Sequence, residues 1–122
     1  MLGGVPEPLA QGLPVEPDLQ RPLSTYFEGQ NAHDVGAMLA CFSDGALVRD
    51  EGREMLGRAA VRAWMEETTR KYQLTVRPIR VSKGDEETTV TVQVSGTFPG
   101  SPIELRYRFT TASSKIARLE ID

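Results

Sequence analysis

Apolar residues recur at helical spacing in three stretches of the first 72 positions, which predicts three helices in this part of the chain. The first stripe begins at Leu19 and has the polar residue Gln30 at its edge. The second follows Asp34, a residue suited to cap a helix, and is expected to end at a turn over 43–45. A third helix is expected over 57–71. The apolar faces of the second and third helices consist of Val35, Met38, Leu39 and Phe42, and of Ala60, Val61, Trp64, Met65 and Thr68.

Alternation of polar and apolar residues replaces the helical pattern elsewhere and predicts strands. A short strand is expected at 46–51, where Ala46, Val48 and Asp50 share one face. From position 73 onward, strands are expected at 74–81, 88–98, 104–111 and 115–121, joined by short turns. Consecutive hairpins form an antiparallel sheet, and helices on one face of a curved sheet enclose an interior. The expected fold is therefore α+β, with a cone-shaped, curved antiparallel sheet covered by three N-terminal helices.

The segment 1–18 differs in composition from the rest of the chain. It contains Pro6, Pro8, Pro14 and Pro17 together with Gly3, Gly4 and Gly12. Proline and glycine at this density oppose a helix and a central strand, so the segment is predicted to be an N-terminal arm preceding a folded domain at 19–122. The arm lacks a basic region followed by an uninterrupted apolar stretch, so a signal peptide is not expected.

Charge and composition narrow the expected partners. The chain of 122 residues carries a net charge of −3 and no basic stripe, so nucleic acid is not expected to bind. No apolar run approaches the roughly 20 residues that cross a bilayer, so the cytoplasm is the expected location. Cys41 is the only cysteine and is expected to be a small buried hydrophobic residue. His33 is the only histidine, and a single histidine makes a poor metal site. No metal and no cofactor is therefore expected.

The first half of the chain contains four motifs in a characteristic order. They are Asn31-Ala32-His33-Asp34, Phe42-Ser43-Asp44, Ala46-Leu47-Val48-Arg49-Asp50 and Gly57-Arg58-Ala59-Ala60-Val61-Arg62. This order resembles ketosteroid isomerases and polyketide cyclases of the SnoaL type, within the nuclear transport factor 2-like superfamily. The resemblance covers about residues 20–122 and implies a cystatin-like α+β barrel with a central pocket. It is weaker for activity, since one fold hosts many chemistries.

The resemblance also implies catalytic roles at matching positions. The ketosteroid isomerases have an oxyanion-donating tyrosine five residues before the Asn of the first motif, where this chain has Tyr26. Their general-base aspartate stands sixteen residues after the Asp of that motif, the position of Asp50. Their second oxyanion donor, a protonated aspartate, corresponds to Leu105, so the oxyanion hole of this chain is expected to be incomplete. Tyr107 is the candidate replacement donor.

The expected function is a cofactor-independent isomerase or cyclase that acts on a small apolar, oxygenated molecule. Asp50 is predicted to remove a proton next to a carbonyl group, with Tyr26 stabilising the enolate. The residues expected to bind the substrate are Tyr107, Trp64, Leu105, Phe109 and Met38.

Two alternatives remain open. The domain could bind a ligand without turnover or serve as a dimeric assembly module, and a homodimer is expected in either case. In the dimeric module, Glu104, Arg106 and Arg108 would make ion pairs across the outer faces of two sheets. The domain could also be a limonene-type epoxide hydrolase, which uses an Asp-Arg-Asp set. That set requires an arginine beside Asp50, but the neighbouring Arg49 should point to the opposite face of its strand.

Overall fold

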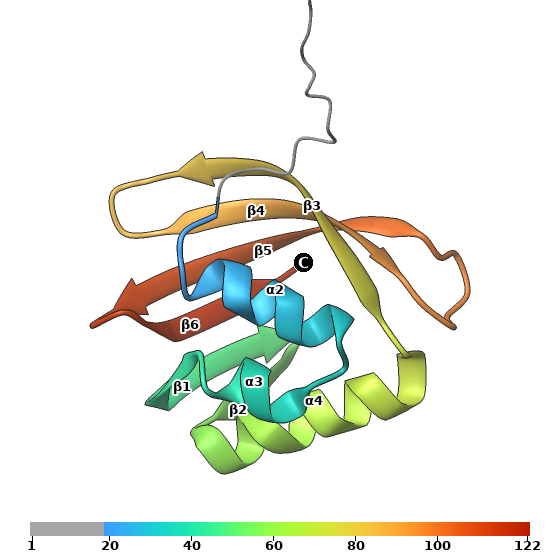
Figure 1. The fold of residues 1–122 in the computed structure, drawn as a ribbon, viewed down its shortest axis with the longest axis horizontal. Helices are drawn as coiled ribbons and strands as arrows, with labels where there is room; N and C mark the ends of the chain where they lie inside the picture. The colour runs from blue at the N-terminus through green and yellow to red at the C-terminus, as the bar shows by residue number, and fades with distance from the viewer. Residues whose placement is uncertain (1–18) are drawn as a thin grey trace, which may run out of the picture.

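A six-stranded sheet organises residues 19–122, the part of the chain that this computed structural model describes (Figure 1). The arm predicted at 1–18 lies outside the described residues. The strands are β1 (Phe42–Asp50), β2 (Arg53–Leu56), β3 (Thr75–Lys83), β4 (Thr88–Ser95), β5 (Ile103–Ala112) and β6 (Lys115–Ile121). The helices are α2 (Leu23–Asn31), α3 (Val35–Leu39) and α4 (Arg58–Tyr72). The predicted α+β class with a curved sheet is confirmed, and the sheet does not close.

The strand order is β2-β1-β6-β5-β4-β3, and all neighbouring strands are antiparallel except β1 and β6. The expectation of a purely antiparallel sheet was therefore wrong for this pair. Strands β3 to β6 follow one another in the chain and must alternate in direction. No short turn joins β1 to β6, because β2, α4 and three strands lie between them in the sequence, so nothing forces these two strands to be antiparallel.

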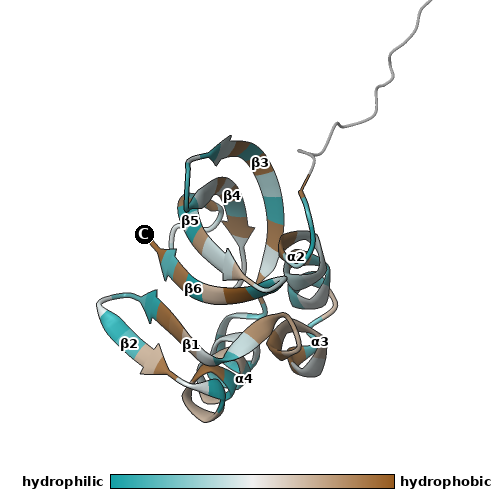
Figure 2. Cartoon of the chain, turned by 90° about the vertical axis from the view of Figure 1, so that its left-hand side faces the viewer, coloured by the Kyte–Doolittle hydropathy of each residue, from teal (hydrophilic) through white to brown (hydrophobic). Residues whose placement is uncertain are grey.

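The sheet is strongly curved (Figure 2), and the buried residues of its inner side form the core with the helices. Along β4, Val90, Val92 and Val94 point inward and alternate with more exposed neighbours, as their period of two predicts. The helices contribute the other wall, mainly through Tyr26 and Phe27 of α2 and through Met38, Val61 and Met65 of α3 and α4. Packing of the sheet around α2 leaves an interior between them.

Three local predictions were wrong. The first helix begins at Leu23, not at Leu19, and the second ends at Leu39, so that Phe42 opens β1. The turn expected at 43–45 lies within β1, where the pairing with β6 shifts register between Phe42 and Leu47. Strand β2 was not predicted. It follows a two-residue turn, Glu51-Gly52, in which both residues have positive φ (54° and 77°), as in the tight turns that suit twisted hairpins.

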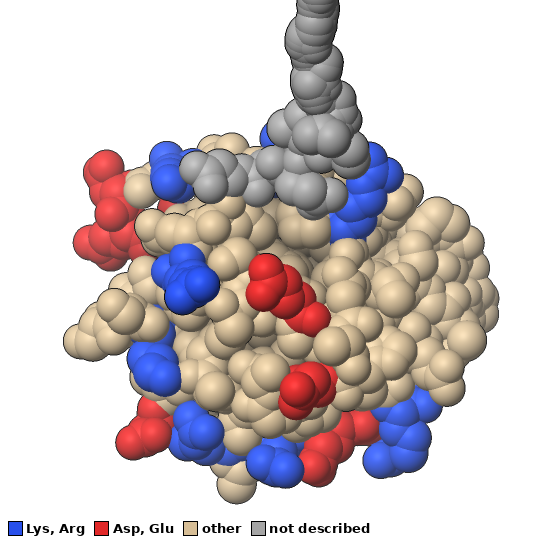
Figure 3. Space-filling view, in the orientation of Figure 1, with Lys and Arg blue, Asp and Glu red and all other residues tan. Residues whose placement is uncertain are grey.

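Charged side chains of both signs are scattered over the face shown in Figure 3, without a concentrated basic patch. Within residues 19–122, no helix is long and apolar enough to cross a bilayer.

Candidate functional site

The inner face of the sheet, α2 and α4 surround a cavity of about 210 Å³. Its wall is largely apolar, and its polar groups come from a few side chains, including an acid, an amide and a phenol. The lining residues are Gln30, Asp50, Glu51, Trp64, Thr68, Tyr72, Leu74, Val94, Phe98, Pro99, Ile103, Leu105, Tyr107 and Ile121. An apolar pocket with a few convergent polar groups is the usual form of a small-molecule site.

Strand register brings the acid and the phenol to one side of this cavity. Asp50 at the end of β1 pairs with Ile121 of β6, and Ile121 pairs with Tyr107 of β5. The three residues form one row across three neighbouring strands, so the backbones of Asp50 and Tyr107 lie about 10 Å apart. Two residues earlier on β5, Leu105 shares the inner face with Tyr107 and also lines the cavity. These positions are far apart in sequence, and the parallel pairing of β1 with β6 brings them together.

The carboxylate of Asp50 is held by an indole. Trp64 on α4 is buried, and its Nε1–H donates a hydrogen bond of 3.0 Å to Asp50 Oδ2. Burial raises the pKa of Asp50 above its ordinary value, while the hydrogen bond from Trp64 opposes that rise. The nearby carboxylate of Glu51 raises the pKa further, and the guanidinium of Arg53 lowers it. Asp50 is therefore a desolvated acid with a fixed orientation at the cavity wall.

The phenol of Tyr107 is almost completely buried, with 2% of its surface exposed. Burial raises the pKa of Tyr107, and the charge of Asp50 raises it further, so the hydroxyl keeps its proton at neutral pH. The polar side chain of Gln30 opposes this rise in the pKa of Tyr107. A neutral buried phenol can donate its proton to an oxygen that gains negative charge.

Four of the seven predicted site residues lie at the cavity wall, namely Asp50, Trp64, Leu105 and Tyr107. Tyr26, Met38 and Phe109 are not among the lining residues and are buried in the core. The ring of Tyr26 packs edge-on against Phe27, Phe42 and Phe109, with centroid distances of 5.4, 5.6 and 5.9 Å. Its pKa is raised well above the ordinary value, first by burial and then by the charges of Tyr107 and Asp50.

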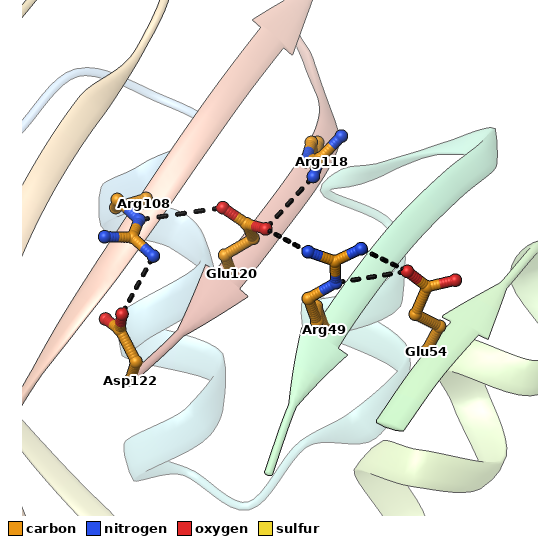
Figure 4. Close-up of polar contacts among 6 residues, drawn as sticks. All are labelled: Arg49, Glu54, Arg108, Arg118, Glu120 and Asp122. Carbon is orange, nitrogen blue, oxygen red and sulfur yellow. Dashed lines mark hydrogen bonds and ion pairs between the residues drawn. The ribbon is translucent and has the colours of Figure 1, made fainter. Parts of the chain in front are cut away.

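Arg49 lies on the opposite face of the sheet, as the alternation along β1 predicts (Figure 4). Its guanidinium pairs with Glu54 of β2 and with Glu120 of β6, the latter at 3.1 Å. Arg108 joins this network through Glu120 at 3.6 Å and also pairs with Asp122 at 2.8 Å, so it forms ion pairs within its own chain. These pairs leave Arg49 away from Asp50, and within residues 19–122 no arginine lines the cavity to complete an Asp-Arg-Asp set.

Sequence reasoning did not find two features of the site. Gln30 was visible only as a polar residue at the edge of an apolar stripe, which is a weak signal for a cavity-lining amide. The role of Trp64 as the partner of Asp50 depends on how α4 packs against β1, and spacing along the chain cannot show it. Among the described residues, no group of three or more His, Cys, Asp or Glu side chains is arranged to hold a metal ion.

Comparison with models of protein families shows to which family this domain belongs. The model of the SnoaL-like domain matches residues 23–118, which covers all the helices and most of the sheet. The chain belongs to the SnoaL-like domain family. Among solved structures, this SnoaL-like domain is similar to a protein from Sinorhizobium meliloti that is provisionally named a polyketide cyclase. The two are 33% identical with a TM-score of 0.83, over 86% of this chain and 96% of the other.

Two more distant structures share the fold. A protein from Catenulispora acidiphila with a ketosteroid isomerase-like fold is 15% identical, with a TM-score of 0.74 over 88% of this chain and 86% of its own. The epoxide hydrolase/cyclase-like enzyme SalBIII is 24% identical, with a TM-score of 0.71 over 81% and 84%. No curated protein matches the chain. The SnoaL-like domain therefore has the fold of cyclase- and isomerase-type proteins, as the sequence motifs indicated.

Proposed function

We propose that this SnoaL-like domain is a cofactor-independent isomerase or cyclase that acts on a small apolar carbonyl compound, with Asp50 as the general base. One observation carries the proposal. Asp50 lies at the wall of an apolar cavity, its pKa is raised by burial, and Trp64 fixes one of its oxygens. A raised pKa brings a carboxylate closer to the basicity that proton abstraction at neutral pH requires.

The proposed reaction uses two groups. Asp50 removes a proton from the carbon next to the substrate carbonyl, and the electron pair moves onto the carbonyl oxygen as an enolate. The Tyr107 hydroxyl donates a hydrogen bond to that oxygen. Asp50 then returns the proton at another carbon, or the enolate carbon attacks a second carbonyl carbon of the same molecule. In the second case the π bond of that carbonyl opens onto its oxygen, which takes the proton from Asp50. The first course is an isomerisation and the second a cyclisation.

The oxyanion site has a single phenol donor in this proposal. Leu105 occupies the position where the resemblance to ketosteroid isomerases implies a second acid, and a leucine cannot donate. Tyr26, the donor implied by that resemblance, is fully buried in the aromatic cluster, so the proposal assigns the role to Tyr107 instead. Loss of one oxyanion donor typically slows acyl-transfer enzymes by about 10²–10³-fold. The substrate is therefore expected to be more acidic than a simple enone, such as a β-dicarbonyl compound.

The size of the cavity limits the substrate. About 210 Å³ is below the roughly 300–1,000 Å³ of typical small-molecule pockets. A compound of one or two rings fits this limit better than a four-ring steroid. The names of the relatives, a polyketide cyclase and an epoxide hydrolase/cyclase-like enzyme, are consistent with oxygenated substrates of this kind.

Proton exchange in D₂O tests the proposal without knowledge of the natural substrate. The domain is expected to accelerate exchange of the protons beside the carbonyl of 1-indanone and of 1,3-indanedione, followed by NMR. Asp50→Asn should reduce this acceleration by about 10²–10⁴-fold, the usual contribution of a general base. Asp44→Asn is the matched control, because Asp44 lies on the same strand but is exposed.

The outcomes separate the proposal from its alternative. If Asp50→Asn binds the ketones and exchanges their protons as fast as the unmodified domain, Asp50 is not the base. If the unmodified domain binds the ketones without accelerating exchange, ligand binding without turnover replaces the enzyme proposal. Homodimerisation is expected for either function and does not distinguish them.

A further inference from the structure

The wall of the cavity changes from buried to exposed along β5. Tyr107 is 2% exposed, Leu105 is half-buried and Ile103 is 38% exposed, and all three line the cavity. Ile103 lies four residues before Tyr107 on the strand, so about 13 Å separates it from the row that contains Asp50 and Tyr107. The cavity therefore reaches the surface at Ile103, away from the two groups to which the proposed function assigns the chemistry.

The loop between β4 and β5 adds more apolar surface at this end of the cavity. Phe98 is half-buried and Pro99 is exposed, and both line the cavity. Ile103 pairs with Val94 at the end of β4, so the loop that follows β4 adjoins Ile103. We call Phe98, Pro99 and Ile103 the apolar rim. Apolar side chains in such a position are available to a ligand that extends out of the cavity.

Contacts with the end of α4 hold this rim in place. The Thr97 N–H donates to the carbonyl of Tyr72 at 2.8 Å, and Thr97 Oγ1 donates to the same carbonyl at 3.1 Å. The ring of Phe98 packs edge-on against the ring of Tyr72, with centroids 6.1 Å apart. Within the loop, the N–H of Gly96 donates to Ser101 Oγ at 3.0 Å. The rim is preformed, so a ligand that covers it pays little conformational entropy for ordering the loop.

We propose that the apolar rim binds an alkyl or aryl tail of the substrate, so that the natural ligand is a carbonyl compound that extends beyond the enclosed volume of about 210 Å³. The carbonyl end lies between Asp50 and Tyr107, and the tail leaves the cavity across Ile103. Continuity of the rim with the cavity favours this occupant, because a ligand held at Tyr107 extends along β5 toward the rim. The inference rests on the proposed function, which places the carbonyl group at Asp50 and Tyr107.

A homologous series of 4-alkylcyclohexanones tests the inference. The alkyl group lies across the ring from the carbonyl group, so a ketone bound at Tyr107 directs its tail away from that residue. The affinities of cyclohexanone and of its methyl, propyl and pentyl derivatives are measured by ligand-observed NMR. Complete burial of a methylene group raises affinity about fourfold, and a methylene group covered on one side gains about half of that free energy, or about twofold in affinity. The pentyl compound should therefore bind about tenfold more tightly than cyclohexanone.

Variants of the rim should weaken this dependence on tail length. Ile103→Asn and Phe98→Ser should each lower the ratio of the pentyl to the cyclohexanone affinity to about threefold, and the affinity for cyclohexanone itself should change little. The two substitutions lie on different elements, so the test survives if one variant does not fold. Ile79→Asn is the matched control, because Ile79 is also a strand isoleucine, is 36% exposed and is not among the lining residues. It should leave the ratio unchanged.

The orientation of the ligand needs its own control. Tyr107→Phe removes the hydroxyl proposed to bind the carbonyl oxygen, so it should lower the affinity of every ketone in the series by the same factor. A loss confined to cyclohexanone would mean that the longer compounds place their tails inside the cavity, which would overturn the inference.

Other outcomes also overturn it. The inference fails if affinity does not rise with tail length, or if it rises equally in the unmodified domain and in both rim variants. A second copy of the chain is the competing occupant of the rim; in that case Ile103→Asn would change the elution volume in size-exclusion chromatography and leave the ketone affinities unchanged. If the domain binds none of the ketones, the proposed carbonyl ligand fails and the inference fails with it. If it binds cyclohexanone and the tail adds nothing, only the inference fails.

Discussion

Asn31 ties the end of α2 to the edge strand β3, and its replacement by alanine should destabilise the domain. The side-chain Nδ2 donates to the carbonyl of Val76 at 2.9 Å, and Oδ1 accepts from the backbone N–H of Val76 at 2.7 Å. Val76 lies on the edge strand β3, and no other strand of the described residues pairs with its outward backbone groups. The amide of Asn31 replaces that missing strand at one residue.

The expected loss in the free energy of unfolding follows from these contacts. Two hydrogen bonds contribute about 0.5–1.5 kcal/mol each, and a backbone group left without a partner costs about 1–3 kcal/mol more where water cannot reach it. Val76 is 6% exposed, so water is expected to replace the amide only in part. Asn31→Ala should therefore lower the free energy of unfolding by about 2–4 kcal/mol, a large share of the roughly 5–15 kcal/mol typical of a domain.

Urea unfolding followed by the fluorescence of Trp64, the only tryptophan, measures this change. Glu28→Ala is the matched control, because Glu28 is an exposed residue of the same helix and should change stability by less than about 0.5 kcal/mol. A loss below about 1 kcal/mol for Asn31→Ala, with the same dependence on urea, would refute the reasoning. It would mean that water satisfies Val76 as well as the asparagine does.

Three further predictions concern Asp50, Trp64 and Gly96. The folded-state pKa of Asp50 is raised above its ordinary value of 3.8, so the folded protein binds more protons than the unfolded chain between these two pKa values. Stability should fall as pH rises through this window, and Asp50→Asn should remove that fall in urea titrations. Trp64→Phe removes a hydrogen bond that lowers the pKa of Asp50, so the pH profile of ketone exchange should move to higher pH; an unmoved profile would contradict this. Gly96→Ala would place a Cβ atom 2.6 Å from the carbonyl oxygen of Tyr72 and should cost about 1–3 kcal/mol, while Gly45→Ala, with no atom within 4 Å, should be nearly neutral in thermal melting.

The sequence predicted the parts of the site that depend on alternation within one element. Asp50 shares a face with Val48, and Tyr107 shares one with Leu105, so both pairs could be assigned to the interior without knowing which strands are neighbours. The row from Asp50 through Ile121 to Tyr107 could not be predicted in this way. It depends on the parallel register of β1 and β6, which is set by packing between segments about 70 residues apart.

The family motif around Asn31 likewise predicted some features correctly and could not predict others. The spacing of this motif predicted the fold correctly, and the contacts of its residues explain why they suit this fold. Asn31 holds β3, and Asp34 accepts from the backbone N–H of Ala37 at 3.0 Å, which caps α3. The same spacing argument pointed to Tyr26 as an oxyanion donor, but aromatic neighbours surround its ring and it does not reach the cavity wall. Spacing fixes the position of a residue along a helix, but not which neighbours fill the space around it.

The sheet formed by residues 19–122 does not close, so within these residues it has two edges without a neighbouring strand, and such edges can recruit a strand from another molecule. The β3 edge is poorly suited to such recruitment. Pro78 in its middle has no N–H to offer, the pairing with β4 is irregular between Pro78 and Arg80, and Arg77 and Arg80 are exposed. The β2 edge is only four residues long. The open shape that leaves room for a cavity is thus combined with edges that resist aggregation, and replacing Pro78 and Arg80 with β-branched apolar residues would be expected to remove that protection.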